Sequence, residues 1–207
     1  ELNVNLDLES WAWVHRLLWV TDVDVAGADL SFGLVVPVVA TEFELENLGV
    51  YDREEGVADI SVSPLTLSWH GDGYDLVAAY DVFLPVADYN ADEPASLGKE
   101  YWTHMLTLGG TYYLDAARRW HASILGRYEI HSERRNTDIQ AGDDFHVEWG
   151  LGHTLTEGLD VGLAGYCQWQ VTDDEGDDIT WDPDDHDKVY AAGVELTTVL
   201  PRSGLPL

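Results

Sequence analysis

The segment LDVGLAGYCQWQVT, residues 159–172, alternates between apolar side chains and polar or small ones. Because neighbouring residues of a β-strand point to opposite faces of a sheet, this period of two predicts a strand with one apolar and one polar face. The apolar row is Leu159, Val161, Leu163, Gly165, Cys167, Trp169 and Val171, and the opposite row is Asp160, Gly162, Ala164, Tyr166, Gln168, Gln170 and Thr172.

The same period of two recurs along the chain, whereas spacing typical of helices is nearly absent. Residues 119–132, for example, read RWHASILGRYEIHS, in which apolar and polar side chains again alternate. Pro64 shifts the apolar phase of one strand, as a β-bulge would. The alternation predicts nine strands, near residues 11–20, 30–45, 57–69, 74–86, 101–114, 119–132, 143–155, 159–172 and 188–200.

The connections between these strands alternate in length. Short links are expected at 70–73, 115–118 and 156–158, with the link at 21–29 on the same side, and long polar links at 46–56, 87–100, 133–142 and 173–187. An antiparallel up-and-down meander places all short turns at one end and all long loops at the other. That arrangement is typical of an outer-membrane β-barrel.

Alternation alone does not distinguish a soluble barrel, which buries its apolar row, from a membrane barrel, which turns that row towards lipid. The polar rows are rich in Gly, Ala, Ser, Thr, Tyr and Gln, which suits a crowded lumen, and the acids concentrate in the loops. Both features favour the transmembrane barrel. Aromatic residues also gather near the strand ends, as interfacial girdles do. They are Trp19, Trp69, Tyr74 and Trp120 towards the short turns, and Trp11, Trp13, Trp102, Trp169 and Tyr190 towards the long loops.

The composition restricts the partners. The 207 residues include 39 acids against 10 Lys plus Arg, a formal net charge of −29 that would repel nucleic acid. Such an acidic surface is typical of a halophilic protein adapted to high salt. Cys167 is the single cysteine, so an internal disulfide or a cysteine metal cluster is excluded.

Six segments resemble a known family in order and spacing. They are GVADISVSPLTLSW (56–69), FLPVADYN (83–90), SLGKEYW (96–102), GTYYLD with RRWHASILGRYE (110–129), YCQWQVTDDEGD (166–177) and KVYAAGVEL (188–196). Together they resemble the outer-membrane β-barrel family linked to the meta-cleavage pathway of phenol degradation, the phenol MetA-degradation family, which includes sphingosine-responsive porin-like transporters. The chain departs from that family where Pro85, Val86 and Ala87 replace Pro-Thr-Gly, and where Val194 replaces a common proline.

The resemblance implies a barrel of about 12 strands in the outer membrane of a Gram-negative bacterium. Nine strands is an odd number and a single-chain bacterial barrel closes with an even one, so we expect residues 1–207 to be one barrel domain that is incomplete at both ends. The family implies passive uptake of small hydrophobic or aromatic compounds, with outer-membrane lipid and the solute as partners. It implies neither catalytic residues nor a cofactor.

Charged residues on the polar rows predict a constriction of the lumen. Arg127, Glu129 and His131 share a strand next to the strand of His146 and Glu148, so opposed registers would bring acid, base and imidazole together. Charged rings set barrel selectivity, and an internal ion-pair network that stiffens the lumen is an equal reading of the same residues. The candidate lumen residues are Tyr101, Tyr113, Arg127, Glu129, His131, His146, Glu148 and Tyr166, with the tyrosines offering stacking faces.

An enzyme is the second function class, because some outer-membrane barrels carry Ser/His hydrolytic sites. His131 and Ser132 are neighbours and point to opposite faces, whereas His121 and Ser123 share a face but lack the turn of a nucleophile elbow. We therefore expect no enzymatic activity.

The third class is a soluble acidic β-barrel that binds ligands, with calcium as a candidate ion. The loop TDDEGDDITWDPDDHDK does not fit an EF-hand, because Gly176 comes too early and no Glu closes the loop. Crowded acids offer oxygen ligands for weak calcium binding, and we expect no preformed metal site. The crowded acids are Asp182, Asp184, Asp185 and Asp187.

Overall fold

The computed structural model describes residues 6–45, 48–90 and 93–198, and its regular structure there is entirely β. Within those residues there is no helix of the length and apolarity needed to cross a membrane. The strands are β1 (Leu6–Val25), β2 (Ala28–Leu45), β3 (Val50–Val57), β4 (Ile60–His70), β5 (Tyr74–Leu84), β6 (Thr103–Tyr113), β7 (Trp120–His131), β8 (Asp144–Thr156), β9 (Leu159–Gln170) and β10 (Lys188–Thr198).

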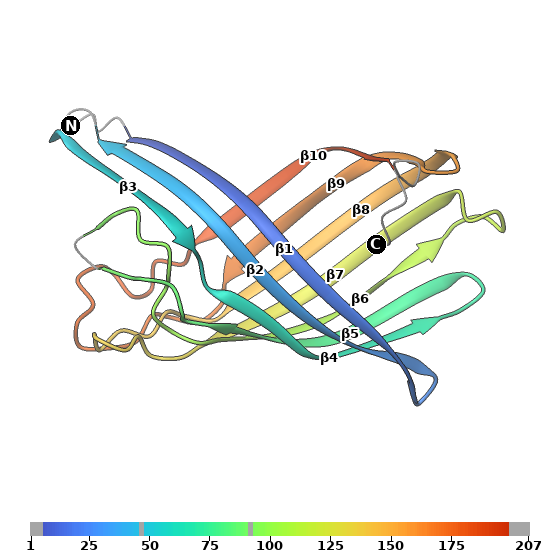
Figure 1. Ribbon diagram of the computed structural model, residues 1–207, viewed down its shortest axis with the longest axis horizontal. Coiled ribbons are helices and arrows are strands. Elements are labelled where there is room, and N and C mark those ends of the chain that lie inside the picture. The colour runs from blue at the N-terminus through green and yellow to red at the C-terminus, as the bar shows by residue number, and fades with distance from the viewer. Residues whose placement is uncertain (1–5, 46–47, 91–92, 199–207) are drawn as a thin grey trace.

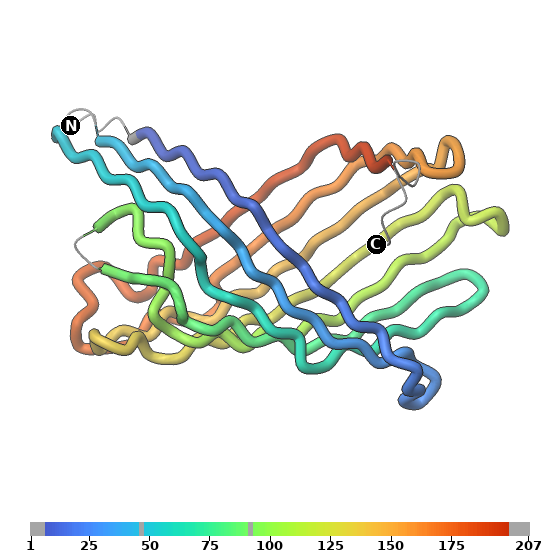
Figure 2. The backbone as a smooth tube through the Cα atoms, in the orientation of Figure 1, coloured from blue at the N-terminus to red at the C-terminus, as the bar shows by residue number. Residues whose placement is uncertain are grey.

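The strands form a single antiparallel sheet that follows the order of the chain. Its path runs β1-β2-β4-β5-β6-β7-β8-β9-β10, and β3 pairs with β2 beside that path. The sheet curls into a half-barrel, which the backbone trace makes visible (Figures 1 and 2). Within the described residues β1 and β10 each have one hydrogen-bonded neighbour, so the two edges of the curl remain open. The predicted antiparallel meander is confirmed.

The prediction of a long polar loop at 46–56 was wrong. Residues Val50–Val57 form β3, which pairs with the last part of β2 from Val38↔Val57 to Leu45↔Val50. After Ala58 and Asp59 the chain continues as β4, which pairs with the first part of β2. Because β3 and β4 follow each other along the same neighbour, they act as one interrupted strand, and the meander passes nine times as predicted.

The predicted link at 21–29 was also wrong. β1 continues to Val25 and β2 begins at Ala28, so the turn consists of Ala26 and Gly27 alone. Both have positive φ, 55° and 81°, as a type I′ hairpin turn requires, and the glycine adopts this conformation without steric cost. The bulge expected at Pro64 is confirmed by a register shift between Val62 and Leu65 against β5.

Short and long connections lie at opposite ends of the half-barrel, as predicted. In Figure 1 the turns β1–β2, β4–β5, β6–β7 and β8–β9 lie at the right, and the connections β5–β6, β7–β8 and β9–β10 lie at the left. The three connections at the left span residues 85–102, 132–143 and 171–187. Each therefore folds over the same end of the sheet, which we call the loop rim.

Apolar side chains are displayed outward instead of being gathered in a core. Leu108 on β6 is 70% exposed and Val194 on β10 is 84% exposed, while the buried apolar side chains of the described residues are Ala28, Ala95 and Met105. A soluble barrel would bury these rows. The outer face of the sheet is therefore apolar, which does not suit contact with water. Large aromatic residues exposed near its two ends are Trp11, Trp13, Trp19, Tyr74, Trp102, Trp120 and Tyr190.

The long connection 85–102 is held down by one carboxylate at the β3–β4 interruption. Asp59 Oδ1 accepts hydrogen bonds from the main-chain N–H of Val86 and Ala87, both at 3.1 Å, and Oδ2 accepts one from Lys99 N at 2.9 Å. Hydrogen bonds to an ionised acceptor are stronger than neutral ones. One side chain therefore fixes both ends of the connection.

We expect Asp59→Ala to loosen this connection while leaving the sheet intact. Three charge-assisted bonds are lost, which lowers the local free energy of opening by about 2 kcal/mol. Amide hydrogen exchange of Val86, Ala87 and Lys99 would speed up accordingly. Asp88→Ala removes an exposed carboxylate from the same connection and is the matched control; equal exchange in both variants would contradict the anchoring role.

Candidate functional site

The charged residues predicted for the lumen lie on the inner face of β7 and β8. Arg127 stands opposite His146 in the antiparallel register, and Glu129 stands opposite Asp144. Contacts form along the diagonal: Arg127 Nη1 lies 2.5 Å from Glu148 Oε1, and His146 Nε2 lies 3.5 Å from Glu129 Oε1. The structure thus brings acid, base and imidazole together. They form two neighbouring acid–base pairs and not a closed ring of charges around the lumen.

His131 extends this set towards the loop rim. Its ring is almost completely buried, with 3% of the residue exposed. Nδ1 lies 2.9 Å from Thr103 Oγ1 on β6, and Nε2 lies 3.4 Å from Asp144 Oδ2 on β8. Asp144 was not among the predicted site residues, because it is the first residue of its strand and follows a polar loop. The register places it at the centre of the site.

Tyr101 covers His131 from the connection 85–102. The two rings meet edge to face with 5.2 Å between their centroids, and the cations of Lys99 and Arg134 lie 5.7 and 6.0 Å from the tyrosine ring centre. Burial raises the pKa of the Tyr101 phenol, and these two cations oppose that shift. The stacking face predicted for Tyr101 is therefore already occupied.

A second polar level lies towards the short turns. His121 Nε2 is 3.7 Å from Asp160 Oδ1, and its ring lies across Gly152, where a Cβ would come within 2.2 Å of the imidazole. Tyr113 donates a 2.6 Å hydrogen bond to Asp75, and the Arg118 guanidinium stacks 4.6 Å from its ring. Tyr113 is the last residue of β6, whereas Tyr101 precedes the first, so the two tyrosines lie at opposite ends of this strand. The ring of Tyr113 is already in contact with Arg118.

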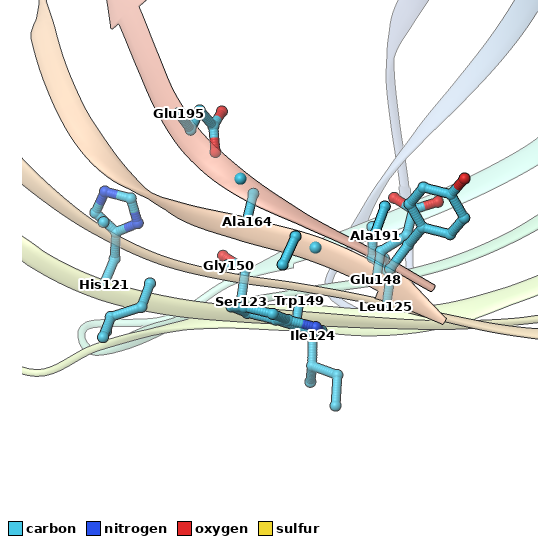
Figure 3. A pocket seen from close by; sticks show the side chains of 16 residues that line it. His121, Ser123, Ile124, Leu125, Glu148, Trp149, Gly150, Ala164, Ala191 and Glu195 are labelled. Atoms are coloured by element: carbon cyan, nitrogen blue, oxygen red, sulfur yellow. The ribbon is translucent and has the colours of Figure 1, made fainter. Parts of the chain in front are cut away.

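Between the two levels the inner face is hollowed by small side chains (Figure 3). A cavity of about 540 Å³ opens over β7 to β10, where Gly150, Ala164 and Ala191 leave room. His121 and Glu195 flank one part of it and Glu148 another (Figure 3). Tyr166 also lines the cavity and remains 39% exposed. Of the three predicted tyrosines, this one offers an aromatic surface to the hollow.

The two Ser/His pairs considered for catalysis are engaged elsewhere. Ser123 Oγ shares a 2.8 Å hydrogen bond with Thr111 Oγ1 on β6, while its neighbour His121 faces Asp160. Ser132 Oγ accepts from Trp102 N at 3.0 Å and donates to the Glu133 carbonyl. These contacts give both hydroxyls a structural role in the sheet and at the rim.

The acidic connection 171–187 packs against the connection 132–143. Asp174 accepts hydrogen bonds from Gly142 N and Gln170 Nε2, both at 2.9 Å, and from Trp181 Nε1 at 2.7 Å. Gln140 and Glu175 form an isolated antiparallel bridge between the same two connections. Trp181, between two acidic clusters, therefore donates the third hydrogen bond that Asp174 accepts.

The predicted calcium residues lie in this connection without converging. The Asp182 side chain accepts from Asp184 N, its carbonyl accepts from Asp185 N, and Asp187 bonds through its main chain to Gln170. Among described residues, three ligand atoms that lie within 4.8 Å of one another belong to Glu129, His131 and Asp144 instead. Calcium binding at the acidic connection stays a prediction. The sequence placed Glu129 and His131 on the polar row of one strand but did not indicate their grouping with Asp144.

Comparisons with known proteins bear on the family and the fold. The sequence profile of the family described as "Putative MetA-pathway of phenol degradation" matches residues 2–203. The fold is similar to the crystal structure of an outer membrane channel from Pseudomonas putida F1, with a TM-score of 0.80 and 17% sequence identity, over 95% of this chain and 73% of that one. No curated protein sequence matches the chain.

The raised pKa of Tyr101 predicts a loss of stability in alkali. The unfolded phenol ionises at about 10, whereas the folded one stays neutral to higher pH, so its stabilising contribution is complete below pH 10 and is lost as pH rises through the folded pKa. We expect Tyr101→Phe to flatten this fall in unfolding free energy above pH 10. Tyr51→Phe, on an exposed residue of β3, is the control and should behave as the wild type.

Proposed function

The chain belongs to the family described as a MetA-pathway of phenol degradation, and we propose that it forms a channel of the Gram-negative outer membrane. Small hydrophobic or aromatic compounds would pass through it by diffusion, without energy input or catalysis. Residues 1–207 act in this proposal as part of one barrel domain, with outer-membrane lipid around the barrel and the solute inside it.

The observation that carries the proposal is the inverted distribution of side chains. Exposed apolar rows cover the outer face of the sheet, and ion pairs such as Arg127–Glu148 lie on its inner face. Lipid suits the apolar rows of the outer face, and a polar lumen suits the ion pairs of the inner face. A soluble binding module would need the opposite arrangement, so the structure favours the channel.

A bilayer also sets a condition on the two open edges. Unpaired N–H and C=O groups cost several kcal/mol each in hydrocarbon, so the working assembly must supply partners for the free sides of β1 and β10. The polar connections at the loop rim suit the extracellular side, where such barrels carry their longer loops. The acidic residues of 171–187 would then face the salty medium.

The lining supports neutral solutes over anions. The hollow over β7 to β10 combines small side chains with the face of Tyr166, and its charged neighbours include Glu148 and Glu195. Arg127 and Glu148 neutralise each other as an ion pair, which leaves Glu195 as the acid of the lining without an ion-pair partner among the described residues. An aromatic carboxylate would therefore meet fixed negative charge without a free guanidinium, whereas a neutral aromatic compound would keep its contact with the small apolar surface.

Uptake across an intact outer membrane tests the function. Cells that carry lipopolysaccharide and express the protein should take up a neutral radiolabelled aromatic compound, such as phenol, several-fold faster than cells without it. Uptake of a benzoate-like carboxylate should gain much less. Equal uptake with and without the protein would refute the channel.

Two neighbouring alanines on β10 show whether the hollow is the route. Ala191 faces Tyr166 on the inner face, and Ala192 stands opposite Gly165 on the outer face. We expect Ala191→Trp to fill the hollow and remove most of the added uptake, because an indole occupies the space left by the small side chains. Ala192→Trp should retain it. Loss in both variants, or in neither, would place the route elsewhere.

Cys167 tests the orientation of the sheet. It belongs to the apolar outer row of β9 and pairs with Tyr190, whereas Gln168 points inward beside His146. In lipid vesicles a bulky water-soluble maleimide should label native Cys167 poorly. It should label Gln168→Cys, made in a Cys167→Ser background, much faster. The reverse order would invert the assignment of the two faces.

A further inference from the structure

We propose that the inner face of β7 and β8 holds a zinc ion at a site that we call the rim cluster, formed by Glu129, His131, Asp144 and His146. The ligand atoms of the first three lie within 4.8 Å of one another. His146 Nε2 lies 3.5 Å from Glu129 Oε1, outside this group of three, and a movement of its ring towards the group would supply the fourth ligand. The zinc proposal depends on this geometry alone and does not rest on the proposed transport function.

The spacing of the donor atoms fits a tetrahedral ion. Zinc binds imidazole nitrogen and carboxylate oxygen at about 2.0–2.2 Å, so neighbouring ligand atoms of a tetrahedron lie about 3.3–3.5 Å apart. His131 Nε2 and Asp144 Oδ2 are 3.4 Å apart, and His146 Nε2 and Glu129 Oε1 are 3.5 Å apart. These two edges already have the length that an inserted ion would impose.

The same distances are long for hydrogen bonds, and one of the ligand atoms is unsatisfied without an ion. The buried Nε2 of His146 has no hydrogen-bond partner among the described residues. Buried polar atoms are normally paired, and an unpaired one needs an explanation such as an ion. A cation between the two imidazoles and the two carboxylates would satisfy His146 and His131 at once.

The surroundings orient His131 as a ligand. Its Nδ1 lies 2.9 Å from the Thr103 hydroxyl, which can accept the Nδ1 proton and leave the Nε2 lone pair directed at Asp144. Metal-bound histidines typically have such a partner for their second nitrogen. Tyr101 covers the ring from the connection above, so the ligand is held in place and shielded.

The donor set selects the class of ion. Two imidazole nitrogens and two carboxylates suit zinc and related first-row ions, whereas calcium takes six to eight oxygen ligands. The two carboxylates also balance a divalent charge. Arg127, the cation next to Glu129 on the inner face of β7, is paired with Glu148 and does not compete for them. The ion would join β7 to β8 and fix the lumen just inside the loop rim.

Calorimetry on the full chain in detergent, after treatment with a chelator, tests the site. We expect one zinc ion per chain in a tight binding step, with no comparable step for calcium. Glu129→Gln and His146→Gln each remove a ligand from a part-exposed position and should weaken zinc binding at least about 100-fold. Thr103→Val, which removes only the orienting hydroxyl, should weaken it about 10-fold.

Matched substitutions on the same inner face provide the controls. Glu195→Gln and His121→Gln alter an acid and an imidazole of the inner face outside the rim cluster, neither of them paired with Arg127, and should leave zinc affinity unchanged. Cobalt in place of zinc should give the strong visible absorption of a tetrahedral complex in the wild type and lose it in His146→Gln. Absence of a tight zinc step, or equal affinity in all four ligand and control variants, would overturn the proposal.

Discussion

Main-chain hydrogen bonding between consecutive antiparallel strands is the interaction on which the rest of the structure depends. The described residues bury few apolar side chains, so packing in a core does not hold the strands together. The ladders do, and they also determine which side chains meet. Opposite β7, for example, a slip of β8 by one residue would place Val147 in line with Arg127 and turn His146 to the outer face. Fold and site are therefore fixed by the same register.

The inner face shows how such a sheet accommodates charge. Acids on one strand contact an imidazole or a guanidinium on the next, as in Arg127–Glu148 and His146–Glu129. These contacts are diagonal because side chains lean along the strand direction. Their alignment in pairs leaves the small residues between them uncovered, so the hollow and the charged levels are products of one pattern.

Period-two alternation predicted the strands and their two faces, because that pattern is a direct consequence of the pleat. It failed at β3, where Asp52, Arg53 and Glu54 present charge on both faces and resemble a loop. Neither face of β3 carries an apolar row that alternation could detect. The sequence also predicted that Glu129, His131 and His146 would approach one another, but Asp144 required the register. Strand ends are where alternation gives least information, since a polar loop residue and an inward-facing residue look alike.

Composition does not show which acids of the long connections order the structure and which ones only contact water. A net charge of −29 is typical of a surface that keeps water and stays soluble in salt. Yet Asp59 and Asp174 each accept three N–H donors and tie long connections to their neighbours. A carboxylate accepts several bonds and brings no donor of its own, so it suits loops whose main-chain N–H groups lack strand partners. Part of the acidity therefore orders the loop rim, and that order holds Tyr101 over His131. The remaining acids can serve solvation without any such constraint, which is why neighbouring aspartates such as Asp184 and Asp185 stay exposed.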